Sequence, residues 1–194
     1  MNFGRLSIWI GLAVALIVPI YLATLSPFLQ YRSTMYVSAG FAGVVAMGCL
    51  LIQPLLAAKV LPGLSARRFR HGHIWVGVSL LVLVIWHVYA LWRTSPPDVM
   101  DALLFRSPTA FSIWGVLAMW AVFLTTLLAV VRKNLRHRAW RKAHVILGAV
   151  IVGGSITHAL LIEGTMEPIS KWVLCILVGC AFLWLVWREL GRRA

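Results

Sequence analysis

The sequence predicts an all-α polytopic membrane protein built as a bundle of six transmembrane helices. Of its 194 residues 61% are hydrophobic and only 12% are charged, whereas soluble domains carry roughly twice that charged fraction. Long uncharged stretches recur along the chain, and each reaches the roughly 20 residues that a helix needs to cross the hydrocarbon. These observations exclude a soluble globular protein, and we expect residues 1–194 to form a single domain.

The first two helices are predicted over residues 6–26 and 35–58, because Arg32 is the only charge between Arg5 and Lys59. The first stretch resembles a secretory signal with a basic residue before an apolar run. Its apolar run is longer than usual, however, and no A-x-A cleavage site follows it. We therefore expect an uncleaved first helix.

Four further uncharged stretches predict the remaining helices, over residues 71–92, 110–131, 139–162 and 169–188. The long connection after the third helix carries a short amphipathic segment, residues 99–105, which we expect on the outer surface. The last helix has only sixteen residues between Lys171 and Arg188. We expect these two side chains to extend toward the membrane surfaces.

The basic residues lie mostly on one side of the predicted membrane. Fourteen of the eighteen lysines and arginines fall there, and four of the five acidic residues fall on the other side. The positive-inside rule then places both termini in the cytoplasm. We expect an inner (plasma) membrane location with lipid around the bundle, and we attribute the net charge of +13 to topology instead of a nucleic-acid partner.

Four histidines show a repeated spacing. His73 and His87 are fourteen residues apart, and so are His144 and His158. Fourteen helical residues return to within roughly 40° of the starting face and rise about 21 Å. Because the third and fifth helices run in the same direction, we expect His73 to meet His144 at the cytoplasmic level and His87 to meet His158 at the outer level.

Opposed neutral imidazoles on facing helices suit bis-axial ligation of a heme iron in a bundle core. We predict two hemes b between the helices at 71–92 and 139–162, with the four spaced histidines as iron ligands. An intramembrane histidine can also serve only as a hydrogen-bonding residue between helices. We assign no ligand role to His71, which points roughly 160° away from His73, or to His137, which falls in the basic cytoplasmic loop. His71 is kept as the alternative to His73.

Small and basic residues near the histidines support this interpretation. Gly77 and Gly148 each follow a cytoplasmic-level histidine by four residues, on the same helix face, where a flat porphyrin needs room. Cationic side chains suit the propionate groups of a heme. The candidates are Arg67, Arg70, Arg141 and Lys142 at the cytoplasmic level, with Arg93 and Arg106 at the outer level.

These residues resemble the ferric reductase-like transmembrane domain, the membrane core of NADPH oxidases, iron metalloreductases and the heme-binding subunit of the bacterial periplasmic methionine sulfoxide reductase system. The motifs that carry the resemblance are His73-x13-His87, the basic entry Arg67-Arg68-Phe69-Arg70, and Trp140-x3-His144 followed by His158. The resemblance implies b-type hemes that pass electrons from cytoplasmic flavin and NAD(P)H to an outer acceptor. Unlike the oxidases, this sequence has no flavin or nicotinamide domain before Ala194, so we expect a separate electron source.

We therefore predict a membrane cytochrome b that passes electrons from a cytoplasmic donor to an outer-side acceptor, namely a ferric chelate, dioxygen or a redox protein. The donor is expected to be a separate flavoprotein reductase or a membrane quinol, so that flavin or quinone enters only through a partner or a diffusible molecule. One alternative is a quinol-oxidising heme subunit of a periplasmic reductase. Another is a non-heme metal transporter or assembly factor, but the two histidine helices lack the acidic residues that line a divalent-metal path.

Overall fold

The computed structural model describes residues 3–191, and within this range it contains helices and connections but no strand. Six of these helices are long and apolar enough to span a membrane, which confirms the predicted all-α, six-helix architecture. The long helices are α1 (Phe3–Thr24), α2 (Thr34–Ala57), α3 (Ala66–Thr94), α5 (Ala110–Val130), α6 (His137–Leu161) and α7 (Pro168–Gly191). A short helix α4 (Pro96–Leu103) and two single 3-10 turns, η1 (Pro27–Leu29) and η2 (Val131–Asn134), lie in the connections.

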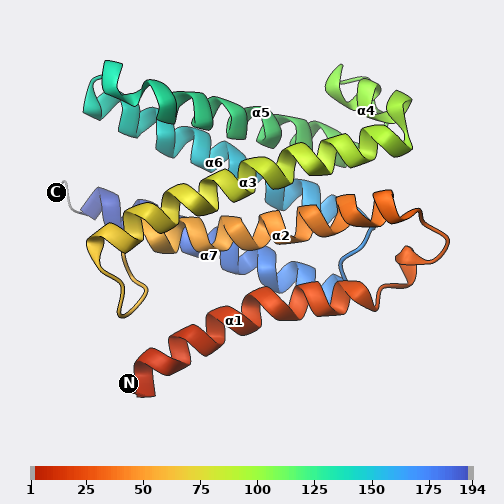
Figure 1. Cartoon of the computed structure of the whole chain (residues 1–194). Coiled ribbons are helices and arrows are strands. Elements are labelled where there is room, and N and C mark those ends of the chain that lie inside the picture. Colours follow the sequence, from red (N-terminus) through yellow and green to blue (C-terminus); the bar gives the residue numbers. More distant parts are fainter. Residues whose placement is uncertain (1–2, 192–194) are drawn as a thin grey trace.

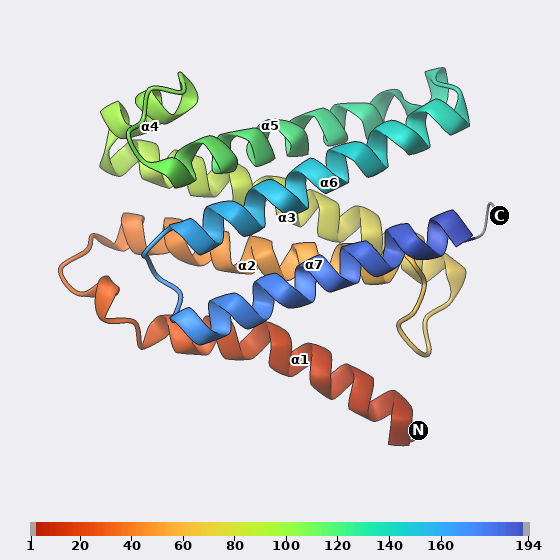
Figure 2. The same cartoon turned by 180° about the vertical axis from the view of Figure 1, so that it is seen from behind.

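The helices form one bundle with two distinct ends (Figures 1 and 2). α1 begins and α7 ends at one end, here called the termini end, and α4 lies at the other, here called the α4 end. α2 packs along α3, α5 packs along α6, and α7 lies against α2 and α6. α3 and α6 therefore run in the same direction, from the termini end to the α4 end, with α5 returning between them.

α3 begins five residues earlier than the predicted start at residue 71. Its N-cap is Ser65, whose hydroxyl accepts a hydrogen bond from the Arg68 backbone N–H at 3.3 Å. The prediction followed the apolar stretch, which marks the part of a helix that crosses hydrocarbon. The capped first turns of α3 come before that stretch, and they carry the exposed Arg67 and Arg70.

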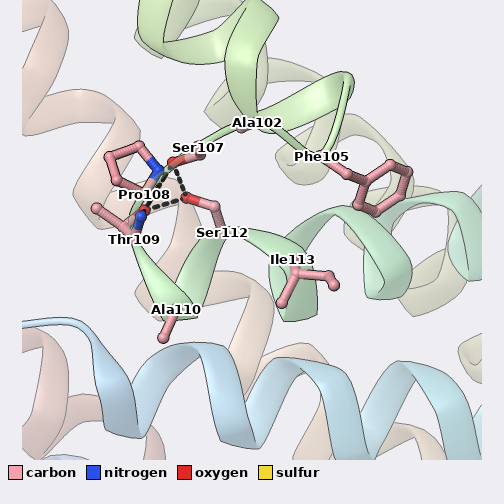
Figure 3. Close-up of a pocket in the computed structure, with 8 residues that line it drawn as sticks. All are labelled: Ala102, Phe105, Ser107, Pro108, Thr109, Ala110, Ser112 and Ile113. Carbon is pink, nitrogen blue, oxygen red and sulfur yellow. Dashed lines mark hydrogen bonds between the residues drawn. The ribbon is translucent and has the colours of Figure 1, made fainter.

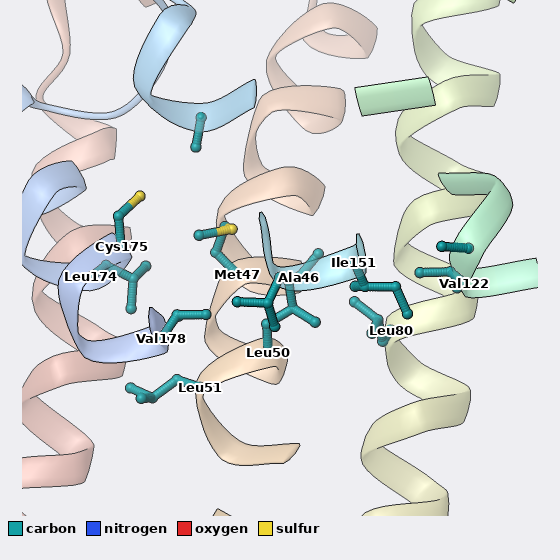
Figure 4. Close-up of a cluster of buried hydrophobic side chains, with 13 residues drawn as sticks. Ala46, Met47, Leu50, Leu51, Leu80, Val122, Ile151, Leu174, Cys175 and Val178 are labelled. Carbon is teal, nitrogen blue, oxygen red and sulfur yellow. The ribbon is translucent and has the colours of Figure 1, made fainter. Parts of the chain in front are cut away.

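The centre of the bundle is a layer of packed hydrocarbon side chains (Figure 4). Leu80 of α3 and Ile151 of α6 are 7% and 6% exposed, and they lie together with Val122 of α5. Leu80 is seven residues from both His73 and His87, and Ile151 is seven residues from both His144 and His158. The two histidine levels are therefore separated by a dry apolar layer.

Two cations of α7 bind the ends of neighbouring helices. Lys171 Nζ donates to the Ile162 carbonyl at the end of α6, and Arg188 Nη1 donates to the Ala58 carbonyl at the end of α2, each at 2.9 Å. Lys171 is only 8% exposed. Lys171 and Arg188 thus reach carbonyl groups at helix ends, because the last carbonyls of a helix lack partners within the helix and attract such donors. Their extension toward the membrane surfaces stays a prediction.

Glu167 caps the start of α7, directly before Pro168. Its carboxylate accepts hydrogen bonds from the backbone N–H groups of Ile169 at 2.8 Å and Ser170 at 2.7 Å. These bonds favour the ionised form, so they lower the pKa of Glu167 below its ordinary value of 4.5. Folding therefore favours the ionised form of Glu167.

This cap predicts a pH-dependent stability. A carboxyl group whose pKa is lowered by folding contributes fully above its ordinary pKa, and this contribution is lost as the pH falls through the lowered value. We expect the wild-type protein to lose more thermal stability between about pH 6 and about pH 3 than the Glu167→Gln variant does, in thermal unfolding of the detergent-solubilised chain. Glu163→Gln, in the same connection, should follow the wild type, and identical pH profiles for all three proteins would refute the prediction.

Candidate cofactor site

The structure brings the four spaced histidines together as two pairs. The ring centroids of His73 and His144 lie 6.1 Å apart, and those of His87 and His158 lie 6.4 Å apart. The first pair lies near the starts of α3 and α6 and is here called the termini-end pair, and the second lies near their ends and is called the α4-end pair. Both pairs join α3 to α6. The predicted meeting of His73 with His144 and of His87 with His158 is confirmed. The assignment of the two levels to the cytoplasmic and outer sides stays a prediction.

The separation of the rings fits a metal ion held between each pair. Two imidazole nitrogens that each lie about 2 Å from one metal place their ring centroids roughly 6 Å apart. Within residues 3–191 no set of three or more His, Cys, Asp or Glu side chains forms a metal-binding group. A metal in these sites would need its other ligands from elsewhere, and a porphyrin supplies four.

The two rings of the α4-end pair are held by backbone carbonyl groups. His87 Nδ1 lies 2.7 Å from the Ala39 carbonyl oxygen of α2, and His158 Nδ1 lies 2.9 Å from the Phe111 carbonyl oxygen of α5. A carbonyl only accepts, so Nδ1 carries the proton and Nε2 keeps its lone pair. This is the arrangement of metal-ligating histidines, in which the second ring nitrogen donates to a fixed acceptor.

The termini-end pair is held differently. His73 Nδ1 lies 3.3 Å from the Gln53 carbonyl oxygen, and Gln53 Nε2 donates back to the His73 carbonyl at 3.2 Å. His144 Nδ1 is buried and has no hydrogen-bond partner. Its ring instead stacks on Trp140, with centroids 5.4 Å apart and planes inclined by 23°.

Two glycines that the sequence analysis missed lie against the α4-end pair. A Cβ atom on Gly43 would lie 3.5 Å from His87 Nδ1, and one on Gly115 would lie 2.7 Å from His158 Nδ1. Each glycine follows the residue that supplies the carbonyl, Ala39 or Phe111, by four positions and so lies next to it on the helix surface. A missing side chain at these positions opens the carbonyl to the imidazole. The only indication in the sequence is a glycine on one face of a helix. Because glycine has no side chain, its chemistry does not identify it as part of a site.

The two glycines that the sequence did single out face other helices. A Cβ on Gly77 would lie 3.0 Å from Gln53 Nε2 of α2, and one on Gly148 would lie 3.3 Å from Phe182 of α7. Gly77 thus leaves room for the Gln53 side chain, which binds the His73 carbonyl, and Gly148 leaves room for the Phe182 ring. Room for a porphyrin at these glycines stays a prediction.

The arginines predicted near the histidines lie at the expected ends of the bundle. Arg67 and Arg70 are exposed on the first turns of α3, and Arg93 is exposed on its last turn. Arg141 forms an ion pair with Glu189 of α7, which ties α6 to α7. Contacts of these side chains with heme propionates stay a prediction.

A small recess lies beside the start of α5 (Figure 3). Its volume is about 170 Å³, and its hydroxyl groups on Ser107, Thr109 and Ser112 bind one another. Sites for small-molecule ligands usually measure about 300–1,000 Å³. We therefore assign no ligand to this recess.

A family profile described as "Ferric reductase like transmembrane component" matches residues 42–155, which is more than half of the chain. The matched segment contains His73, His87 and His144 and ends three residues before His158. No curated protein and no solved structure was found to match this sequence.

The glycine beside His158 predicts a local cost of substitution. Gly115→Ala places a methyl group against His158 Nδ1, so either the ring or α5 must shift, and we expect a loss of about 1–3 kcal/mol in unfolding free energy. Gly153→Ala on α6 is the matched control because nothing lies within 4 Å of its added methyl group. We expect this control to be neutral or to gain up to about 1 kcal/mol from helix propensity. Denaturant unfolding in micelles measures both, and equal stabilities of the two variants would contradict the expectation.

Proposed function

The chain belongs to the ferric reductase-like transmembrane family, and from this premise we propose that it is a membrane cytochrome b that binds two hemes b and transfers electrons across the inner membrane. The family assignment indicates a membrane electron-transfer component. The observation that carries the finer proposal is the pair of histidine contacts, with centroids 6.1 and 6.4 Å apart at two levels of the bundle.

Heme b, when bound, supplies one-electron redox chemistry at its iron. The chain supplies the ligands, their orientation and a dry surrounding. Nε2 of His73, His87, His144 and His158 would hold the metal, and the carbonyls of Ala39 and Phe111 keep two of these rings in the correct tautomer. Leu80 and Ile151 exclude water between the two levels.

The two levels also suit transfer across a membrane. Fourteen residues of helix separate them by about 21 Å, within a hydrocarbon layer about 30 Å thick. One site therefore lies toward each surface. Ten basic residues lie at the termini end, in the α2–α3 and α5–α6 connections and in the first turns of α3 and α6 that follow them. By the positive-inside rule we assign this end to the cytoplasm.

With this orientation the termini-end pair receives electrons from a cytoplasmic donor, and the α4-end pair delivers them to an outer acceptor such as a ferric chelate, dioxygen or a redox protein. We further propose that the donor is a separate flavoprotein reductase with an acidic docking surface. The proposal is supported by the basic face, which we define as the exposed cations of the two connections and of the first turns of α3 and α6. They are Lys59, Arg67, Arg68, Arg70, Arg132, Lys133, Arg136, Arg138 and Lys142.

The heme content tests the central proposal. We expect two hemes b per chain in a pyridine hemochrome assay, because two pairs of ligands are present. His73→Ala and His144→Ala should each lose the same heme, and His87→Ala and His158→Ala should each lose the other, as identified by redox titration. His71→Ala and His137→Ala are the controls and should keep both hemes.

Three outcomes would count against this assignment. A colourless wild-type protein removes the cytochrome and favours a transporter or assembly factor. A ratio of one heme per chain makes one pair structural. Equivalent spectra for His73→Ala and His87→Ala contradict ligation across α3 and α6.

The docking proposal predicts a salt-dependent reduction rate. Replacing Lys133, Arg136 and Arg138 with alanine removes three exposed charges from the basic face but keeps the Arg141–Glu189 ion pair. We expect slower heme reduction by an acidic flavoprotein at low salt and a smaller difference at high salt, where screening weakens steering. Stopped-flow absorbance measures the rate, on protein shown to be correctly inserted and fully loaded with heme. Unchanged, salt-independent kinetics would reject docking here and favour a membrane quinol as the donor.

A further inference from the structure

His144 differs from the other three paired histidines. His73, His87 and His158 each place Nδ1 within 3.3 Å of a backbone carbonyl oxygen, whereas His144 Nδ1 is buried without a partner. The torsion that turns an imidazole ring about its Cβ–Cγ bond is broad. A hydrogen bond to a fixed carbonyl removes that freedom in three rings, so the fourth ring needs another restraint.

Trp140 occupies the position that can supply this restraint. It precedes His144 by four residues on α6, so the two side chains lie on the same face. Their rings are nearly parallel, with an angle of 23° and a centroid distance of 5.4 Å, which is the range of offset stacking. On the preceding turn the His137 ring lies 6.0 Å from Trp140, so three rings follow one another along this face.

We propose that Trp140 is the positioning residue of the termini-end site, and that its stacked ring fixes the plane of His144 where a hydrogen bond fixes the other three ligands. The inference rests on the proposed function, in which His144 ligates a heme. Trp140 Nε1 is itself buried and unpartnered, so it makes no hydrogen bond that would explain the placement of the indole. Trp140 therefore contacts His144 through the face of its indole ring.

The angle between two axial imidazole planes controls the low-spin ferric EPR spectrum of a heme, so this spectrum reports on ring order. In the Trp140→Leu variant the plane of His144 is no longer fixed, and we expect the termini-end signal to shift and broaden or to be lost. The α4-end signal should not change. Trp140→Phe keeps an aromatic face without the N–H group and should restore the sharp signal. The His144→Ala variant shows which signal belongs to the termini end.

A matched control exists at the other pair. The Phe111 ring contacts the His158 ring at 5.7 Å, but the backbone carbonyl of Phe111 also binds His158 Nδ1. Phe111→Leu removes the ring and keeps the carbonyl, so the α4-end signal should stay sharp.

Three results would overturn the proposal. The first is a wild-type termini-end signal in Trp140→Leu, and the second is a Trp140→Phe spectrum as disturbed as that of Trp140→Leu. The third is equal broadening at the other pair in Phe111→Leu. A wild-type protein without heme would instead refute the proposed function, and that result is obtained separately from the hemochrome assay.

Discussion

Two pairs of imidazoles can meet at once only if both helices carry their histidines at the same spacing. α3 and α6 satisfy this requirement with fourteen residues each, and they run in the same direction, so His73 meets His144 while His87 meets His158. Any change of spacing on one helix would separate one pair. The order of the remaining helices follows, because α5 must return across the bundle before α6 can repeat the direction of α3.

The histidine helices depend on the helices beside them. α2 lies along α3 and supplies the carbonyls of Ala39 and Gln53, and α5 lies along α6 and supplies the carbonyl of Phe111. Each paired histidine ring is thereby fixed relative to a second helix, with His144 as the exception. α7 closes the bundle by binding carbonyl groups at the ends of α2 and α6 through Arg188 and Lys171. The positions of the four histidines therefore depend on α2, α5 and α7 as well as on α3 and α6.

The sequence was sufficient to predict the features that follow from its apolar composition and from the spacing of its histidines. Long apolar stretches predicted the six spanning helices, and the spacing of the histidines predicted which rings meet. It was insufficient where the partner is a backbone atom, because the acceptors at Ala39 and Phe111 have no distinctive side chain. Gly43 and Gly115 were missed for the same reason, and the start of α3 was misplaced because a cap such as Ser65 lies outside the apolar stretch.

The use of main-chain acceptors has a consequence for how substitutions affect such a site. A carbonyl group is present whatever side chain the residue carries, so a substitution at residue 39 or 111 cannot delete the acceptor. The space beside the carbonyl depends instead on a neighbouring residue that makes no bond itself. A Cβ atom at residue 115 would lie 2.7 Å from His158 Nδ1, whereas one at residue 43 would lie at an ordinary contact distance of 3.5 Å from His87. At the His158 bond, a side chain added beside the acceptor is therefore more disruptive than a change at the residue that supplies it.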